Sequence, residues 1–236
     1  TYASLGRVAR HEHRDVSGGW LRPTVFGAMD GLVTNVSLIA GVGGGGLSRS
    51  HIVLTGVAGL VAGAFSMATG EFTSVTSQNE LVESEVDVER RQLADYPTEE
   101  QAELAQFFVA KGVDKALATE VAEQVSRNRE EALRLHAREE LGIDPDELPS
   151  PVVAAVSSFF SFSIGAVIPL ISYLAGSSEL YLALAIAAVA LFIAGAVVAK
   201  LTAQNIWYGG VRQLVLAVLA AGVTYGVGRG IGTSVS

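Results

Sequence analysis

The sequence contains no cysteine, so disulfide bonds and thiolate metal sites are both excluded. Charge is also scarce: only 17% of the 236 residues are charged, whereas 50% are hydrophobic. The polar stretch 1–20 has no apolar core of the kind found in a signal peptide, so we expect membrane targeting to come from the apolar segments further on. This profile is typical of a polytopic helical membrane protein rather than a soluble domain.

Five apolar segments are long enough to cross a bilayer, which takes about 20 residues. They cover residues 25–47, 52–75, 152–174, 180–199 and 206–227. Hydrocarbon offers backbone groups no hydrogen-bond partner, so each segment is expected to be a helix. The sequence therefore predicts an all-α, multi-pass membrane protein with five transmembrane helices per protomer.

The acidic residues are concentrated between the second and third apolar segments. Of the 24 acidic residues, 19 lie between Thr76 and Pro149. Apolar positions recur at helical spacing here, which predicts three short helices over 98–112, 113–128 and 129–142, with Thr98 as the first N-cap and Gly112 and Gly142 as C-caps. We therefore divide the chain into an N-terminal arm (1–22), two transmembrane helices (23–76), an acidic helical module (77–149) and three transmembrane helices (150–236).

Lysine and arginine predict the orientation of the chain. Counting along the five spans, 14 of the 16 basic residues fall on one side, leaving only Arg49 and Arg229 on the other. Because cytoplasmic loops carry the excess of positive charge, the N-terminus and the acidic module are expected on the cytosolic side of the membrane. The expected membrane is a bacterial inner membrane.

Two carboxylates lie inside the apolar segments, where a charged side chain is costly. Asp30 shares a helix face with Thr34, and Glu71 lies one turn after Met67. Asp30 alone could be a helix-end residue that reaches the interface. A second membrane carboxylate beside a thioether favours a pathway for a metal ion or a proton.

The acidic module offers further candidate ligands. Glu100 and Glu103 lie at i, i+3, His136 and Glu140 lie at i, i+4, and Glu89 lies near the end of the helix that continues from the second span. Carboxylates with an imidazole suit Fe²⁺, Mn²⁺, Co²⁺ or Zn²⁺. On spacing alone, these helices are equally explained as solvated acidic surfaces.

Several motifs together resemble the vacuolar iron transporter family, in a bacterial-type form. The resemblance is carried by residues 30–34 (DGLVT), 63–72 (GAFSMATGEF), 140–142 (ELG) and 168–170 (IPL), and covers nearly the whole chain after Trp20. It implies a five-helix homodimer that moves Fe²⁺, and often Mn²⁺, out of the cytosol in exchange for protons, along a path between the subunits.

By position, the resemblance implies that Asp30 and Met67 are membrane ligands and that the module ligands are Glu89, Glu100, Glu103 and Glu140. The chain departs from plant members at five positions: it has Gly59 in place of a membrane glutamate, Glu71 in place of a small residue, Gln92 in place of a module glutamate, and His136-Ala137 in place of a methionine pair. We expect Glu71 to act as the proton or metal carboxylate and His136 to remain a competent ligand.

Two other functions are open at this point. One is a membrane-anchored metal sensor or scaffold, in which the module binds ions without transport. The other is a di-iron oxidase, although no histidine of the sequence has a glutamate three residues before it. We expect no enzyme activity, no prosthetic group and no nucleic-acid partner. The expected partners are divalent metal ions, protons, the lipid bilayer and a second copy of the chain.

Overall fold

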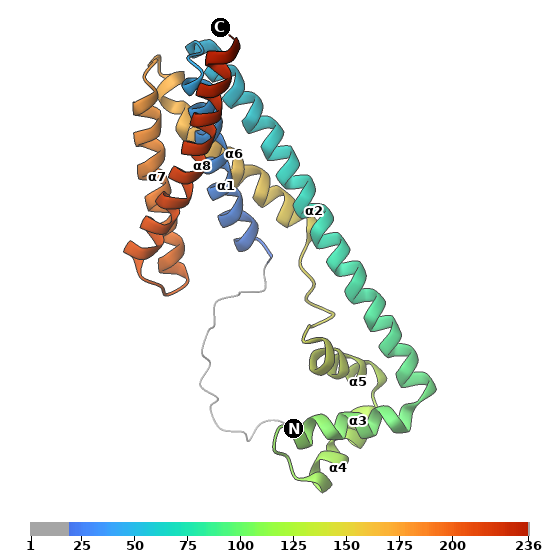
Figure 1. Cartoon of the computed structure of the whole chain (residues 1–236). Coiled ribbons are helices and arrows are strands. Elements are labelled where there is room, and N and C mark those ends of the chain that lie inside the picture. Colours follow the sequence, from blue (N-terminus) through green and yellow to red (C-terminus); the bar gives the residue numbers. More distant parts are fainter. Residues whose placement is uncertain (1–18, 236) are drawn as a thin grey trace.

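The computed structural model describes residues 19–235, with the side chains of residues 19–232. This part of the chain contains no strand. Its helices are α1 (Leu21–Gly44), α2 (Arg49–Asp95), α3 (Pro97–Ala110), α4 (Lys115–Ser126), α5 (Arg129–His136), α6 (Pro151–Leu174), α7 (Leu180–Leu201) and α8 (Ile206–Val235), and a π-helical turn η1 covers Ala137–Leu141 (Figure 1). Most of the predicted N-terminal arm lies outside the described residues.

Five of these helices, α1, α2, α6, α7 and α8, are long and apolar enough to cross a membrane. The prediction of an all-α chain with five membrane helices is therefore confirmed. The first helix begins at Leu21, four residues earlier than the apolar segment, because Arg22 and Pro23 continue the helix beyond the apolar run. It ends in the run of four glycines at residues 43–46, where Gly46 has a φ of +74°.

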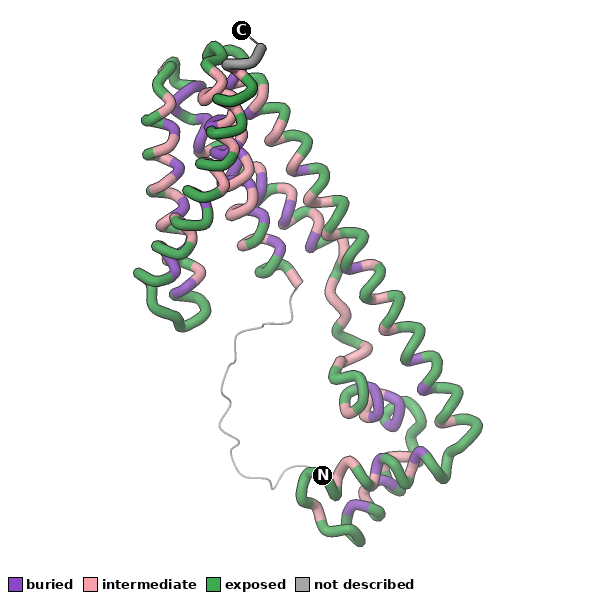
Figure 2. The backbone as a smooth tube through the Cα atoms, viewed as in Figure 1, coloured by how far each residue is buried: buried purple, intermediate pink, exposed green. Residues whose placement is uncertain are grey.

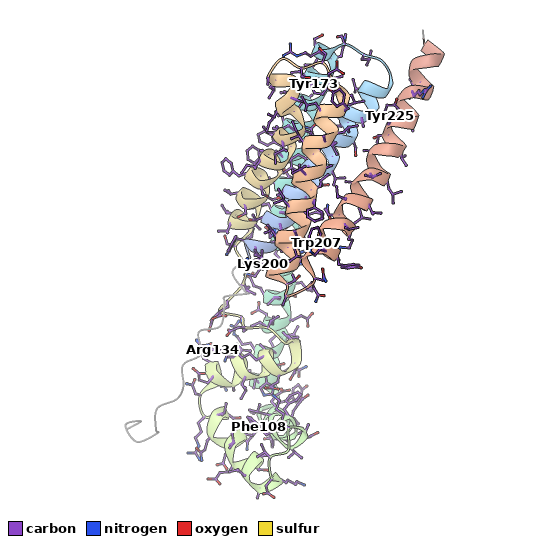
Figure 3. All side chains as sticks on the ribbon, turned by 90° about the vertical axis from the view of Figure 1, so that its left-hand side faces the viewer. Phe108, Arg134, Tyr173, Lys200, Trp207 and Tyr225 are labelled. Carbon is purple, nitrogen blue, oxygen red and sulfur yellow. The ribbon has the colours of Figure 1, made fainter. Side chains whose placement is uncertain are left out.

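Helix α2 joins the membrane bundle to the acidic residues without a break (Figure 1). Its 47 residues correspond to roughly 70 Å of helix, whereas a bilayer core is about 30 Å thick. The charged half of α2 after Ser77 therefore extends well beyond the apolar half. Figure 3 shows the two parts at opposite ends, with Tyr173 in the bundle and Phe108 with Arg134 in the small helices.

Glycine sets the spacing of the bundle at its centre, where α1 crosses α6. A Cβ atom on Gly31 would lie 2.2 Å from the carbonyl oxygen of Phe162, and one on Gly165 would lie 2.1 Å from that of Ala28. Both distances are far below contact distance, so only glycine fits. Figure 2 shows the consequence: α1 and α6 carry many of the bundle's buried residues, whereas α2 and α8 are mostly exposed.

The small helices pack around their own core, as the helical spacing predicts. Leu104 of α3 and Ala118 and Ala122 of α4 are fully buried, and Val86 of α2 packs on Leu133 and Ala137. Helix α4 has an Asp114 cap, whose carboxylate accepts a hydrogen bond from the backbone N–H of Ala116 at 2.9 Å.

Two local predictions in this region are wrong. Thr98 is not an N-cap: α3 begins at Pro97 and is preceded by Tyr96, because proline is well suited to the first helical position. Residues 129–142 are not one α-helix, since α5 changes to a π-helical turn after His136. The predicted C-cap at Gly142 is confirmed by its left-handed φ of +68°.

Candidate metal sites in the bundle and in the acidic helices

A groove of about 350 Å³ lies between α1, α2 and α6 in the half of the bundle nearest the acidic helices. Its lining includes all four residues that the sequence marks as a membrane pathway, namely Asp30, Thr34, Met67 and Glu71. We call it the bundle groove. The Thr34 hydroxyl donates a hydrogen bond to Asp30 Oδ1 at 3.3 Å, which orients the carboxylate.

Helical periodicity explains how distant residues meet here. Arg22, Phe26, Asp30 and Thr34 are spaced by four along α1, and Gly63, Met67, Gly70 and Ser74 occupy one face of α2. Phe162 of α6 completes the lining. The groove thus offers two carboxylates, a thioether and hydroxyls, a donor set that a divalent transition metal ion can use.

A second group of ligands lies in the acidic helices. Glu89 of α2, Glu100 of α3, His136 of α5 and Glu140 of η1 place one ligand atom each within 4.8 Å of one another. We call it the acidic cluster. His136 Nδ1 lies 3.2 Å from Glu89 Oε1, 3.7 Å from Glu100 Oε2 and 3.1 Å from Glu140 Oε1.

Three of the four residues of the acidic cluster are buried, which is unusual for so many charges, and Glu140 is exposed. The His136 side chain is fully buried, and those of Glu89 and Glu100 are only 11% and 9% exposed. His136 Nε2 has no hydrogen-bond partner among the described residues, and Glu89 Oε1 has only its ion-pair contact with His136 Nδ1. Buried polar atoms normally have a partner, so these atoms are arranged as expected for ligands of a bound cation.

Electrostatics agree with this reading. The pKa of Glu89 is raised to about 7, chiefly by burial and then by the nearby charge of Glu140, with a further contribution from Glu100, while His136 lowers it. Burial also raises the pKa of Glu100. Three carboxylates this close repel one another, and a divalent cation removes that repulsion. Because the donors are oxygen and nitrogen, the site fits Fe²⁺, Mn²⁺, Co²⁺ or Zn²⁺.

Packing holds the cluster together from several sides. Val86 of α2 contacts Leu133 and Ala137, which fixes α5 against the helix that carries Glu89. The Phe107 ring meets the His136 ring edge to face at 6.5 Å. The π-helical turn accommodates Glu140 next to His136, and such turns are frequent at functional sites.

Not every predicted ligand joins the cluster. Glu103 is exposed on α3 and is not one of the four clustered residues. Its charge nevertheless helps raise the pKa of Glu100: burial raises that pKa most, His136 lowers it, and the charges of Glu103 and then Glu140 raise it. The assignment of Glu103 as a ligand stays a prediction. Arg22, Ser66, Ser74 and Phe162 line the bundle groove, although no sequence signal singled them out for it.

Five membrane helices, a groove with two carboxylates and a thioether, and a buried carboxylate–histidine cluster define a multi-pass membrane protein equipped to handle metal ions. The VIT family model matches residues 21–229, so the chain belongs to the VIT family. It is 35% identical over 225 residues to the vacuolar iron transporter of Acanthamoeba castellanii, and the alignment covers 93% of this chain and 81% of the relative. It is 37% identical over 214 residues to the vacuolar iron transporter homolog 1 of Oryza sativa subsp. japonica, covering 88% and 72%.

Proposed function

We propose that the protein transports Fe²⁺, and with it Mn²⁺, Co²⁺ or Zn²⁺, out of the cytosol in exchange for protons. The observation that carries this proposal is the bundle groove, in which Asp30, Met67 and Glu71 face one space inside an apolar bundle. Ionisable groups are costly in a membrane and typically mark ion pathways. The names of the Acanthamoeba and rice relatives support iron as the cargo.

The steps follow from the two sites. The acidic cluster binds the hydrated ion and removes part of its water, and the ion then enters the bundle groove. There Asp30 and Met67 replace water ligands, while Glu71 releases a proton to the cytosolic side as the metal binds. Metal and proton compete for the same carboxylate oxygens, and this competition couples their opposite movements.

The proposed assembly is a homodimer in which α2 faces its partner. Phe65, Ser66, Thr69, Gly70, Thr73 and Ser74 are exposed along one face of α2. Hydroxyl-bearing side chains gain nothing from lipid, whereas small polar residues favour contact between membrane helices. A second copy of α2 on this face would place the bundle groove beside the interface.

The proposed orientation puts the acidic cluster in the cytosol. Lys200 and Trp207 lie at the end of the bundle nearest the acidic helices, and Tyr173 lies at the opposite end (Figure 3). Arg22 also lies at the near end, in the bundle groove. An excess of positive charge is typical of the cytoplasmic side, which supports this orientation, whereas a tryptophan is common at either interface.

The direct test is uptake of metal into liposomes that contain the full chain. We expect Fe²⁺ uptake when the lumen is more acidic than the outside, slower uptake when the pH gradient is collapsed, and alkalinisation of the lumen as metal enters. The same assay with Mn²⁺, Co²⁺ and Zn²⁺ ranks the cargo. Binding of metal to the protein without any uptake would support the sensor or scaffold instead, and oxygen-dependent oxidation of Fe²⁺ would support the oxidase.

A further inference from the structure

Asn35 is a buried polar residue on α1 that neither metal site uses. It is 1% exposed, and its Oδ1 atom has no hydrogen-bond partner among the described residues. Its position immediately follows Thr34, the innermost α1 residue of the bundle groove. Burying a polar oxygen without a hydrogen bond costs free energy. A ligand that binds this oxygen only during part of the protein's working cycle would explain why it has no permanent partner.

The orientation of the amide is fixed by its other end. Asn35 Nδ2 donates a hydrogen bond to the carbonyl oxygen of Ala166 on α6. That carbonyl can only accept a hydrogen bond, so the amide NH₂ must face it and Oδ1 must point away. The oxygen faces α2: the position that a Cβ atom on Gly59 would occupy lies 3.7 Å from Oδ1.

Beyond the bundle groove, three large side chains from α1 and α6 pack against glycines of α2 and close the contact between these helices. Phe162 fills the notch at Gly63, Leu38 fills the notch at Gly59, and Leu170 fills the notch at Gly56. In each case a Cβ atom on the glycine would lie 2.3 to 2.4 Å from that side chain. An ion leaving the groove along α2 therefore meets Phe162 first, and then reaches the level of Gly59, where the Asn35 oxygen lies.

We propose that Asn35 Oδ1 is a further ligand for the transported cation, one helical turn beyond the bundle groove along α2. The inference rests on the proposed transport function and extends its route. Amide oxygens are normal ligands of hard divalent cations, and a neutral one lets the ion leave again because it adds no charge to hold it. In this state, Leu38 and Leu170 keep the site closed towards the far end of the bundle.

Two substitutions separate a ligand from a structural anchor. Asn35→Leu removes the oxygen with little change of volume, and Asn35→Asp keeps an oxygen of the same shape and adds charge. Ser37→Ala is the matched control, because Ser37 is also buried on α1 with an unpartnered hydroxyl but lies on the surface shared with α8. Each variant is reconstituted as the full chain, and uptake of Fe²⁺, Mn²⁺, Co²⁺ and Zn²⁺ is measured beside metal binding in detergent.

We expect Asn35→Leu to lower uptake by about 10-fold while metal binding in detergent changes less than about twofold, because an inner ligand is lost and the entry sites remain. Asn35→Asp should retain uptake but raise Mn²⁺ relative to Zn²⁺, since a carboxylate favours the harder ion. Ser37→Ala should preserve both rate and rank order.

Normal uptake by Asn35→Leu would overturn the inference. So would an equal loss for all four ions in both Asn35 variants, because an anchor between α1 and α6 has no means of distinguishing ions. If the unmodified protein takes up no metal at all, the transport function itself fails, which is a separate result.

Discussion

The bundle groove and the acidic cluster present metal ions with contrasting surroundings. The cluster combines three carboxylates with an imidazole, all brought together by packing of small helices against α2. The groove combines two carboxylates with a thioether and is bordered by the positive charge of Arg22. The cluster is suited to holding a divalent ion, whereas the groove, with fewer charges and a softer ligand, is suited to releasing one.

The two sites also differ in how they are connected to the rest of the molecule. Glu71 and Glu89 lie on the same unbroken helix, 18 positions apart in the sequence, which corresponds to about 27 Å. An ion cannot touch both at once. Substitutions at one site should therefore leave binding at the other intact, and this independence can be tested site by site.

The largest effect is expected in the groove. Asp30→Asn removes a charge that the ion meets inside the membrane, and we expect a loss of uptake of about 100-fold, at the upper end of what a lost metal contact costs. Metal binding by the acidic cluster should persist, as measured by titration calorimetry of the full chain in detergent. Glu80→Gln, an exposed carboxylate on the same helix as Glu71, is the control. Full uptake by Asp30→Asn would remove the groove from the pathway.

The second effect concerns the acidic cluster. His136→Leu should weaken metal binding by about 10- to 100-fold, because it removes the only nitrogen ligand. Uptake at saturating metal should fall much less, since the groove is unchanged. Glu103→Gln is the matched control and should alter affinity by less than about twofold, because its side chain lies outside the cluster and only adds to the local charge. Equal losses in the two variants would show that Glu103 is a ligand after all.

The smallest effect is a change with pH. The pKa of Glu89 is raised to about 7 from 4.5, so the folded protein binds a proton that the unfolded chain releases between those values. Without metal, the free energy of unfolding should therefore fall as pH rises from about 4.5 to 7. Metal affinity should rise over pH 6 to 8, by up to about tenfold per unit for one displaced proton.

Thermal unfolding in chelator and dye competition measure these two trends. Glu89→Gln should flatten both curves, because it has no proton to exchange. A steep pH dependence that persists in this variant would assign the titration to another group.

Much of this arrangement follows from the sequence because it depends on periodicity and hydropathy. Spacing by four along α1 and α2 is sufficient to bring Asp30 and Thr34, and Met67 and Glu71, onto matching faces. The grouping of Glu89, Glu100 and His136 depends instead on how three helices pack, which spacing within one helix does not reveal. Glu103 illustrates the limit: it lies three positions from Glu100, yet it is not among the four residues whose ligand atoms meet.

The π-helical turn and the Asn35 amide were equally invisible in the sequence. A π turn differs from an α-helix by the path of the backbone at Ala137–Leu141, and no residue there is specific to it. Asn35 lies within an apolar segment, and its value as a ligand depends on the positions of Ala166 and Gly59 on two other helices.

The unbroken length of α2 has one mechanical consequence. A helix that packs against α6 at Gly56 and Gly63 and against α1 at Gly59 turns about those contacts, so a slight tilt there becomes a much larger displacement at Asp95. The acidic helices are attached to the far end of α2, where this displacement is largest. Any movement of α2 at these contacts therefore has to carry the acidic helices with it.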